Sequence, residues 1–421
     1  MSVVRSDSVG WLLDHPSYIN QSYRCCHHIS PDTRCCRYIF RAEYFDIEKP
    51  HIADSETSGG QEPGGGNSRL KVRNCKRKSR EPNQGEVEAQ EYHKKVSLTI
   101  QNGTRKLIER SMEAGEQGTN TRAPAGGVCA PRRITSVIVD SALVELCSMA
   151  KQMAQDQHQP VQVISNKESA ADLDLLARLT ENSTDCAWIV TLMGQRYLLP
   201  PRSSFLLSDI SCMEPLLSYK KYDVIALDPP WENKSVKRSK GYSHLFPWQI
   251  QQIPMSALSA PGCLVVSWVT NRQRHLRFVK EELYPSWSVE VVAEWYWVKV
   301  TRRGEFVVPL DSTHKKPYEI LVLGRYKGSS ERQDGEPVTV PDCKLIVSVP
   351  CALHSHKPPL GEVLKGLIKP HAECLELFAR NLQPGWTSWG NEVLRFQQLD
   401  YFQELDIEEG DSGCCSQTLT V

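Results

Sequence analysis

Apolar and polar positions alternate in blocks through the second half of the chain, and these blocks predict a series of strands and helices. Short apolar runs predict buried strands, and apolar residues at helical spacing predict amphipathic helices. The expected strands are 222–227, 262–269, 289–300, 319–324 and 374–378, and the expected helices are 271–283 and 359–367. This alternation predicts an α/β domain over 203–404, with a mostly parallel sheet covered by helices.

The remaining chain divides by composition into four segments. Residues 1–50 mix aromatic and apolar positions and are expected to be ordered. Residues 51–90 are rich in Gly, Ser, Glu and Lys, which predicts a disordered linker. We expect an accessory domain over 91–202 and a flexible tail over 405–421.

The pattern also predicts local elements within these segments. Strand character is found over 35–45, and a strand or hairpin is expected over 187–199. Helical pieces are expected on either side of Asn102-Gly103, and a further helix over 136–153.

The overall charge gives no sign of a nucleic-acid partner, because 50 basic residues balance 50 acidic ones. Any nucleic-acid surface must therefore be a local patch. No apolar run reaches the roughly 18 residues of a membrane-spanning helix, so no membrane partner is expected. Residues 1–18 make a poor secretory or mitochondrial leader.

A basic run lies within the expected linker. Its members are Lys71, Arg73, Lys76, Arg77, Lys78 and Arg80. Such a run is typical of a nuclear localisation signal or a nucleic-acid contact, and a solvated linker is an equal alternative. We expect a nuclear protein, with the cytosol and the mitochondrion left open.

The fifteen cysteines are scattered and odd in number, which favours reduced thiols over a disulfide framework. One group suggests zinc: Cys25, Cys26, His27, His28, Cys35 and Cys36. Paired zinc ligands are usually separated by two or more residues, and adjacent cysteines cannot easily chelate one ion. No metal site is therefore assigned.

The most informative motif is Asp228-Pro229-Pro230-Trp231, directly after the expected strand 222–227. Proline has no N–H to donate to a sheet, so the proline pair ends the strand. In open α/β sheets, ligands bind at the carboxyl ends of strands. The motif predicts such a site, and a strand end with a turn-forming proline pair is the plain alternative.

The motif suits chemistry on an aromatic amine, whose lone pair is delocalised into the ring and is a poor nucleophile. The Asp228 carboxylate and the Pro229 carbonyl, fixed by Pro230, can accept both amine hydrogens and aim the lone pair at an electrophilic carbon. Trp231 can stack on the base, a contact worth roughly 1–3 kcal/mol. A sulfonium donor would supply the methyl group, with positioning and electrostatics providing most of the rate.

Residues of about 205–400 resemble the DPPW, or MT-A type, family of adenine-N6 methyltransferases. Besides the motif, the resemblance rests on 232–235 with Tyr242, on 316–319, on 376–386 and on 390–392. It implies a Rossmann-like methyltransferase fold with permuted motif order, in which the catalytic motif precedes the cofactor strand. It also implies S-adenosylmethionine as the cofactor.

The resemblance carries cofactor contacts to matching positions. These are Asp209, Ile210, His356, Lys357, Arg380, Asn381, Asn391 and Glu392. Lys357 would hold the methionine carboxylate, and Arg380 with Asn381 the ribose. The sequence departs from the family pattern in two ways. The loop after Arg380 is shorter, and Glu392 replaces a Gln. Taken singly, Asp209 could instead cap a turn and Asn391 a helix.

Nucleic-acid contacts are expected beside the motif, where basic residues interleave with aromatic ones. The candidates are Asn233, Lys234, Ser235, Lys237, Arg238, Tyr242, Trp268, Trp297, Lys299 and Lys316. The alternative is a solvated basic loop for the charged residues and packing in the core for the tryptophans.

Together these inferences predict an S-adenosylmethionine-dependent adenine-N6 methyltransferase that acts on RNA as a single chain. The resemblance implies an internal 2′-O-methyladenosine of U2 small nuclear RNA as the substrate. Two alternatives stay open: an adenine-N6 methyltransferase of nuclear or mitochondrial DNA, and a catalytically silent RNA-binding scaffold. Intact Asp228 and Trp231 argue against the scaffold.

Overall fold

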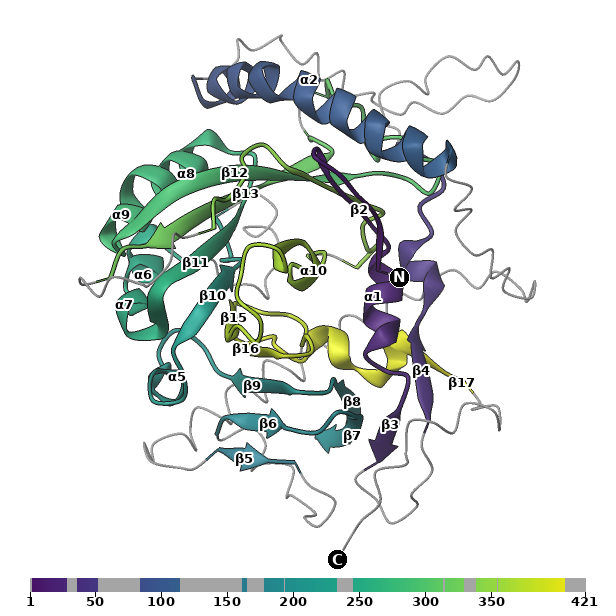
Figure 1. The fold of residues 1–421 in the computed structure, drawn as a ribbon, viewed down its shortest axis with the longest axis vertical. Helices are drawn as coiled ribbons and strands as arrows, with labels where there is room; N and C mark the ends of the chain where they lie inside the picture. The colour runs from purple at the N-terminus through teal and green to yellow at the C-terminus, as the bar shows by residue number, and fades with distance from the viewer. Residues whose placement is uncertain are drawn as a thin grey trace, which may run out of the picture.

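A large mixed sheet runs through the middle of the molecule (Figure 1). The computed structural model describes residues 2–28, 36–51, 84–113, 161–164, 178–192, 194–232, 245–312, 315–328, 338–353 and 355–405. Within these ranges the sheet has twelve strands. In spatial order they are β1 (Val3–Ser6), β2 (Gly10–Leu13), β14 (Leu345–Ser348), β12 (Val289–Lys299), β13 (Tyr318–Tyr326), β11 (Ser259–Val269), β10 (Tyr222–Leu227), β15 (Cys374–Leu377), β16 (Trp386–Gly390), β9 (Ser203–Leu207), β6 (Thr180–Asn182) and β5 (Gln162–Val163).

The centre of this sheet is parallel, as the alternating pattern predicts. β10 pairs in parallel with β11 on one side and β15 on the other, and β15, β16 and β9 continue in the same direction. β13 is antiparallel to both of its neighbours, which makes the whole sheet mixed. β10 is buried along almost its whole length, which explains its near-continuous apolar sequence. The expected α/β fold is confirmed.

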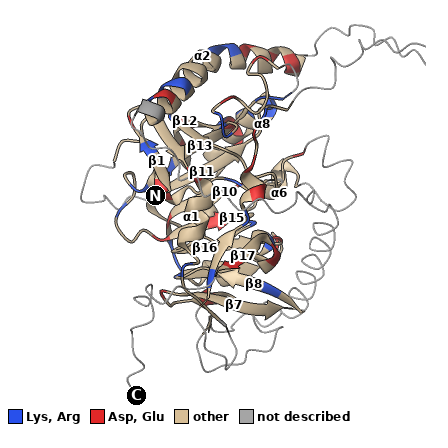
Figure 2. Ribbon diagram, turned by 90° about the vertical axis from the view of Figure 1, so that its right-hand side faces the viewer, with Lys and Arg blue, Asp and Glu red and all other residues tan. Residues whose placement is uncertain are grey.

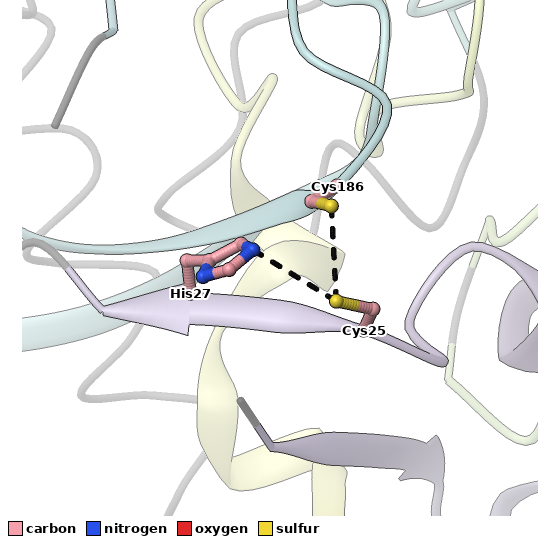
Figure 3. Close-up of side chains that lie close together, drawn as sticks. All are labelled: Cys25, His27 and Cys186. Carbon is pink, nitrogen blue, oxygen red and sulfur yellow. Dashed lines mark hydrogen bonds between the residues drawn. The ribbon is translucent and has the colours of Figure 1, made fainter. Parts of the chain in front are cut away.

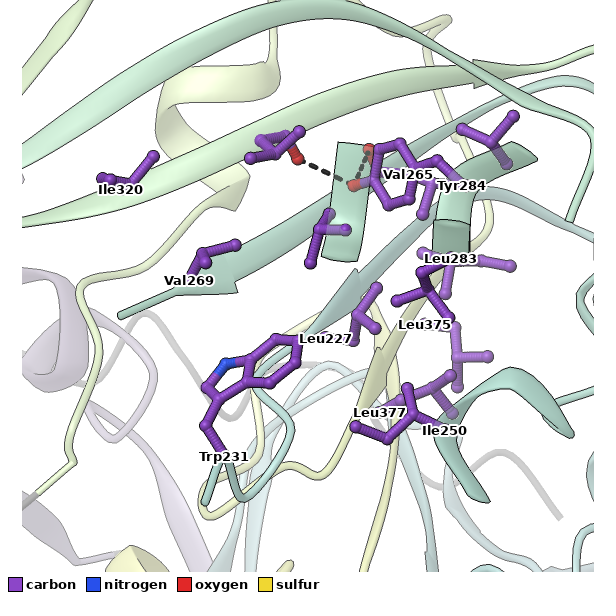
Figure 4. Packing of buried hydrophobic residues seen from close by; sticks show 14 of the residues in the cluster. Leu227, Trp231, Ile250, Val265, Val269, Leu283, Tyr284, Ile320, Leu375 and Leu377 are labelled. Atoms are coloured by element: carbon purple, nitrogen blue, oxygen red, sulfur yellow. Dashed lines mark hydrogen bonds between the residues drawn. The ribbon is translucent and has the colours of Figure 1, made fainter. Parts of the chain in front are cut away.

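Helical segments cover both faces of the sheet. The helix expected over 271–283 is present as α8 (Gln273–Arg277), the π-helical η3 (Phe278–Leu283) and α9 (Tyr284–Ser286). Leu283 and Tyr284 reach from it into an apolar cluster with Leu227 and Leu375 (Figure 4). α10 (Gly361–Leu364) packs on a separate buried cluster and is shorter than the expected 359–367. Pro359 lacks an N–H and stands just before its start.

α2 (Gln84–Glu113) is one continuous helix, and the expected break at Asn102-Gly103 is wrong. It lies along one end of the sheet, next to β14 and β2 (Figure 1). A Cβ on Gly103 would come within 2.4 Å of Leu345 Cδ1 and 2.8 Å of Val9 Cγ1. Gly103 therefore serves close packing of the helix on the sheet rather than a turn.

Two small sheets lie beside the main one. β7 (Ala187–Leu192) and β8 (Gln195–Leu199) form the expected hairpin, and β3 (Cys26–His28) joins it in parallel. β4 (Arg37–Phe40) pairs with β17 (Phe402–Leu405). The remaining elements are α1 (His15–Gln21), η1 (Ala42–Phe45), α5 (Glu214–Leu217), α6 (Pro247–Gln251), α7 (Met255–Leu258), η4 (Arg395–Gln397) and η5 (Leu399–Tyr401).

The first residues of the chain thus contribute β1 and β2 to the main sheet and β3 to a small one. The expected domain bounds stay a prediction. The helix expected over 136–153 and the basic run of residues 71–80 lie outside the described residues. None of the helices in the described ranges has the length and apolar content that a membrane-spanning helix needs.

Candidate active site

Four neighbouring parallel strands end at one edge of the sheet, and the sequence-predicted residues follow them within a few positions. Asp228 comes after β10, Arg380 after β15, Asn391 after β16 and Asp209 after β9. Ligands of open α/β sheets bind at this carboxyl edge. The structure therefore brings the motif and several of the expected cofactor residues to one edge.

Asp228 is held there by two cationic side chains. Its Oδ2 accepts a hydrogen bond from Arg380 Nη1 at 3.0 Å and lies 3.4 Å from Lys357 Nζ. All three side chains are largely buried, with 10–13% of their surface exposed. Within the described part of the chain, both contacts fall on Oδ2. Oδ1 is thus left to accept a hydrogen bond from a substrate amine.

Lys357 also belongs to a second ion pair, with Glu319. Lys357 Nζ donates to Glu319 Oε2 at 2.7 Å, and Lys299 Nζ donates to the other oxygen at 2.5 Å. Burial alone would lower the pKa of Lys357, but the charges of Asp228 and Glu319 outweigh it and raise that pKa. Burial would raise the pKa of Glu319, yet the two lysines hold it far below its usual range. Both groups therefore stay charged at neutral pH.

Glu392 fixes Arg380 from the other side. Its Oε2 accepts from Arg380 Nε at 3.0 Å, and its Oε1 accepts from Arg395 Nη1 at 2.8 Å. Asn391 beside it is exposed, and Asn381 is half-buried. Glu392, expected to close the ribose site, is in this structure the bridge between two arginines.

A small pocket adjoins this network. Asn381, His356 and Lys357 line it together with His15 and Tyr18 from the start of the chain. The N-terminal segment therefore forms one wall beside the predicted cofactor residues. Sequence reasoning missed this wall, because nothing about His15 or Tyr18 in the sequence points to the cofactor residues of the distant motif region.

The tryptophans lie in the core, which differs from the expected stacking on a base. Trp231 is only 6% exposed and lies among buried apolar side chains (Figure 4). Its Nε1 donates to the Trp268 carbonyl at 2.9 Å, and its ring stacks on His275 at 5.2 Å. Trp268 and Trp297 are 2% and 3% exposed and pack edge to face. Strand aromatics usually pack inward, as these do. Trp268 lies under the Lys357 ammonium, 5.5 Å from its ring centre.

The other predicted residues are placed as follows. Asp209 accepts from Ser211 N and Oγ at 3.0 and 2.6 Å, which is the turn-capping alternative, and Ile210 packs partly buried on the core. His356 is buried against Phe396, and burial holds its pKa well below its usual range. Lys316 is half-buried, and burial lowers its pKa. Outside the described residues lie Asn233, Lys234, Ser235, Lys237, Arg238 and Tyr242.

Glu376 is a buried acid at the start of the segment 376–386, and no role is predicted for it from the sequence. It lies on β15 opposite Ala226 of β10, and its Oε2 accepts from Gln383 Nε2 at 2.8 Å. Burial, with the nearby charge of Asp228, raises its pKa to about 7. The sequence feature that could have identified Glu376 is a single acidic residue within an otherwise apolar strand.

Two exposed aromatic residues also stand beside the motif. Phe246 and Trp248 are 52% and 56% exposed, at the start of α6. The neighbouring Leu245 N donates to the Pro230 carbonyl at 3.3 Å, which ties this element to the motif. Exposure depends on tertiary structure, so the sequence could not single them out.

Comparison with known proteins identifies the family of the central region of the chain. The family model described as MT-A70 matches residues 222–392. The match thus begins with β10 and ends at Glu392, and it encloses Asp228, Lys357 and Arg380.

Three relatives differ in what their names say. The human N(6)-adenine-specific methyltransferase METTL4 is 47% identical over 479 residues, which cover 97% of this chain and 100% of that protein. The N6-methyladenosine RNA methyltransferase MTA1 of Pyricularia oryzae is 34% identical over 258 residues, 58% of this chain and 64% of that protein. The DNA N6-methyl methyltransferase of Caenorhabditis elegans is 34% identical over 223 residues, 50% of this chain and 56% of that protein.

Proposed function

Because the chain belongs to the MT-A70 family, we propose that it transfers a methyl group from S-adenosylmethionine to N6 of adenine in a nucleic acid. One observation carries this proposal. The Asp228 carboxylate stands at the carboxyl end of β10, fixed by Arg380 and Lys357, with one oxygen left for an amine.

The side chains at this edge fit the cofactor's polar groups. Lys357 matches a carboxylate in charge, and a lysine ammonium has three N–H donors. Asn381 and Asn391 offer amide groups suited to hydroxyls, and Asp209 offers a carboxylate to an amine. When bound, S-adenosylmethionine supplies an electrophilic methyl group.

The motif would orient the substrate amine. Asp228 accepts one amine hydrogen through Oδ1, and the Pro229 carbonyl accepts the other. That carbonyl already accepts from Trp231 N at 2.8 Å, but its second lone pair remains. Two acceptors outside the ring turn the nitrogen lone pair towards the methyl donor. The rate then comes mainly from positioning two reactants in one geometry.

A surface beside the motif suits a nucleic-acid strand. Lys and Arg lie along α2 and around α8, mixed with acidic residues (Figure 2). Arg272 and Arg274 donate to the Glu232 carbonyl, directly after the motif. Phe246 and Trp248 offer exposed rings for stacking, and stacking combined with basic residues binds single strands.

Our more specific proposal is RNA, with an internal 2′-O-methyladenosine of U2 small nuclear RNA as the site. It rests on the family resemblance of the motif region. DNA is the second candidate, because relatives named for RNA and for DNA are each 34% identical to the chain. Activity as a single chain, and a nuclear location based on the basic run of residues 71–80, are further parts of the proposal.

Methyl transfer to three matched oligonucleotides tests the substrate. They carry deoxyadenosine, adenosine or 2′-O-methyladenosine at one position, and methyl incorporation is measured by mass spectrometry. We expect the 2′-O-methylated site to react fastest. Fastest reaction at deoxyadenosine would favour the DNA enzyme, and binding of all three without any transfer would favour the scaffold.

A further inference from the structure

Three metal-ligating side chains, none of them part of the candidate active site, meet at the small sheet of β3, β7 and β8. Cys25 lies just before β3, His27 is the middle residue of β3, and Cys186 lies just before β7 (Figure 3). Their ligand atoms all lie within 4.8 Å of one another. Cys25 Sγ is 3.7 Å from Cys186 Sγ and 3.8 Å from His27 Nε2.

The backbone explains why they converge. β3 and β7 are parallel, with Cys26 opposite Ala187, and Ala187 N donates to the Cys25 carbonyl at 3.0 Å. Cys25 and Cys186 are therefore lateral neighbours on adjacent chain segments. Residues two apart on a strand share a face, so His27 points to the same side as Cys25.

The distances from Cys25 Sγ to the other two ligand atoms match those between ligands of a tetrahedral zinc ion. Zinc binds thiolate sulfur at about 2.3 Å and imidazole nitrogen at about 2.0–2.1 Å. Tetrahedral angles then place two sulfurs about 3.8 Å apart and a sulfur and a nitrogen about 3.6 Å apart. The observed 3.7 and 3.8 Å lie close to both values. A disulfide requires about 2.05 Å between sulfurs, so Cys25 and Cys186 are not bonded to each other here.

We propose that Cys25, His27 and Cys186 bind a structural zinc ion. Two thiolates and a neutral imidazole balance the charge of Zn²⁺, and a water molecule or another side chain completes four ligands. The ion would fasten β3, which pairs over only three residues, to the β7–β8 hairpin. This site is independent of methyl transfer. Adjacent cysteines need not chelate the ion here, because Cys26 is not among the three ligands and Cys186 comes from a distant part of the chain.

Metal analysis of the full-length protein tests the proposal. We expect about one zinc per chain, and a loss of at least tenfold in the double variant Cys25→Ser/Cys186→Ser. Cys343→Ser, which changes an exposed thiol elsewhere, is the matched control and should keep the metal. Equal zinc in the double variant, or none in the unsubstituted protein, would overturn the site.

A second measurement uses the spectrum of a substituted metal ion. After chelation and loading with Co²⁺, the unsubstituted protein should show thiolate-to-cobalt charge transfer and the intense visible bands of a tetrahedral ion. His27→Asn should weaken or shift those bands. Absence of the bands, or recovery of a Cys25–Cys186 disulfide-linked peptide from the native protein, would refute a zinc site.

Discussion

At the scale of a single residue, Asp228 has its two carboxylate oxygens in different situations. Oδ2 is committed to Arg380 and Lys357, and these contacts fix the direction in which Oδ1 points. A side chain held in this way loses little freedom when the substrate arrives, so its orientation contributes to the rate.

Asp228→Asn should reduce methyl transfer by about 100-fold or more, while RNA binding changes little, because an amide is a weaker acceptor than a carboxylate and can present an N–H instead. Single-turnover rates and binding titrations measure the two effects separately. Asp185→Asn, which changes an exposed carboxylate paired with Arg202, is the control and should be neutral. Turnover preserved in Asp228→Asn would remove Asp228 from the mechanism.

The raised pKa of Glu376 should make the free energy of unfolding depend on pH. Its pKa is raised from 4.5 to about 7 in the folded state, so between these values the folded protein binds more protons than the unfolded chain. The free energy of unfolding should therefore fall as pH rises from about 4.5 to about 7, by on the order of 3 kcal/mol at most.

Glu376→Gln should remove this term. The variant should match the unsubstituted protein near pH 4.5 and be the more stable of the two at pH 8, as measured by urea denaturation. Glu290→Gln changes an exposed glutamate paired with Lys327 and should leave the pH profile unchanged. An identical pH profile for Glu376→Gln would show that Glu376 ionises normally.

At the scale of an element, the start of α6 presents two aromatic rings to solvent beside Asp228-Pro229-Pro230-Trp231. Phe246→Ala with Trp248→Ala should weaken the binding of a single-stranded nucleic acid, because each stacked base contributes roughly 1–3 kcal/mol. Thermal stability should change little, since both rings are exposed. Fluorescence anisotropy measures the affinity, and Val338→Ala, at an exposed apolar residue elsewhere, is the control. Unchanged affinity would show that these rings do not stack on the bases of a bound strand.

At the scale of the whole molecule, the sequence predicts which segments form strands and helices better than it predicts which distant segments pair. The strands 222–227 and 374–378 and the hairpin 187–199 were predictable because their signals are local runs and alternations. Asp228, Lys357 and Arg380 were grouped by motif resemblance, and the structure places them together. The pairing of β2 with β14 was not predictable, because each strand has only four residues and the two are separated by more than 330 residues of chain.

The same long-range pairing can be tested at Gly10. A Cβ there would come within 2.0 Å of the Leu345 backbone oxygen, so Gly10→Val should push β2 away from β14. We expect the free energy of unfolding to fall by about 1–3 kcal/mol. The exposed edge of β14 should then cause self-association. Thermal denaturation and light scattering measure the two effects. Ser8→Val, at an exposed position of the same hairpin, should fold normally.

The position of β2 also has a consequence during synthesis. Gly10 pairs with Leu345, so β2 must wait for a sheet neighbour that is made more than 330 residues later. At about 5–20 residues per second, the ribosome needs roughly twenty seconds to a minute to reach residue 345. Through that interval Trp11 lacks Trp295, the ring against which it packs in the finished protein. Until β14 has been made, the apolar residues of β2 lack part of their packing and are exposed to chaperones.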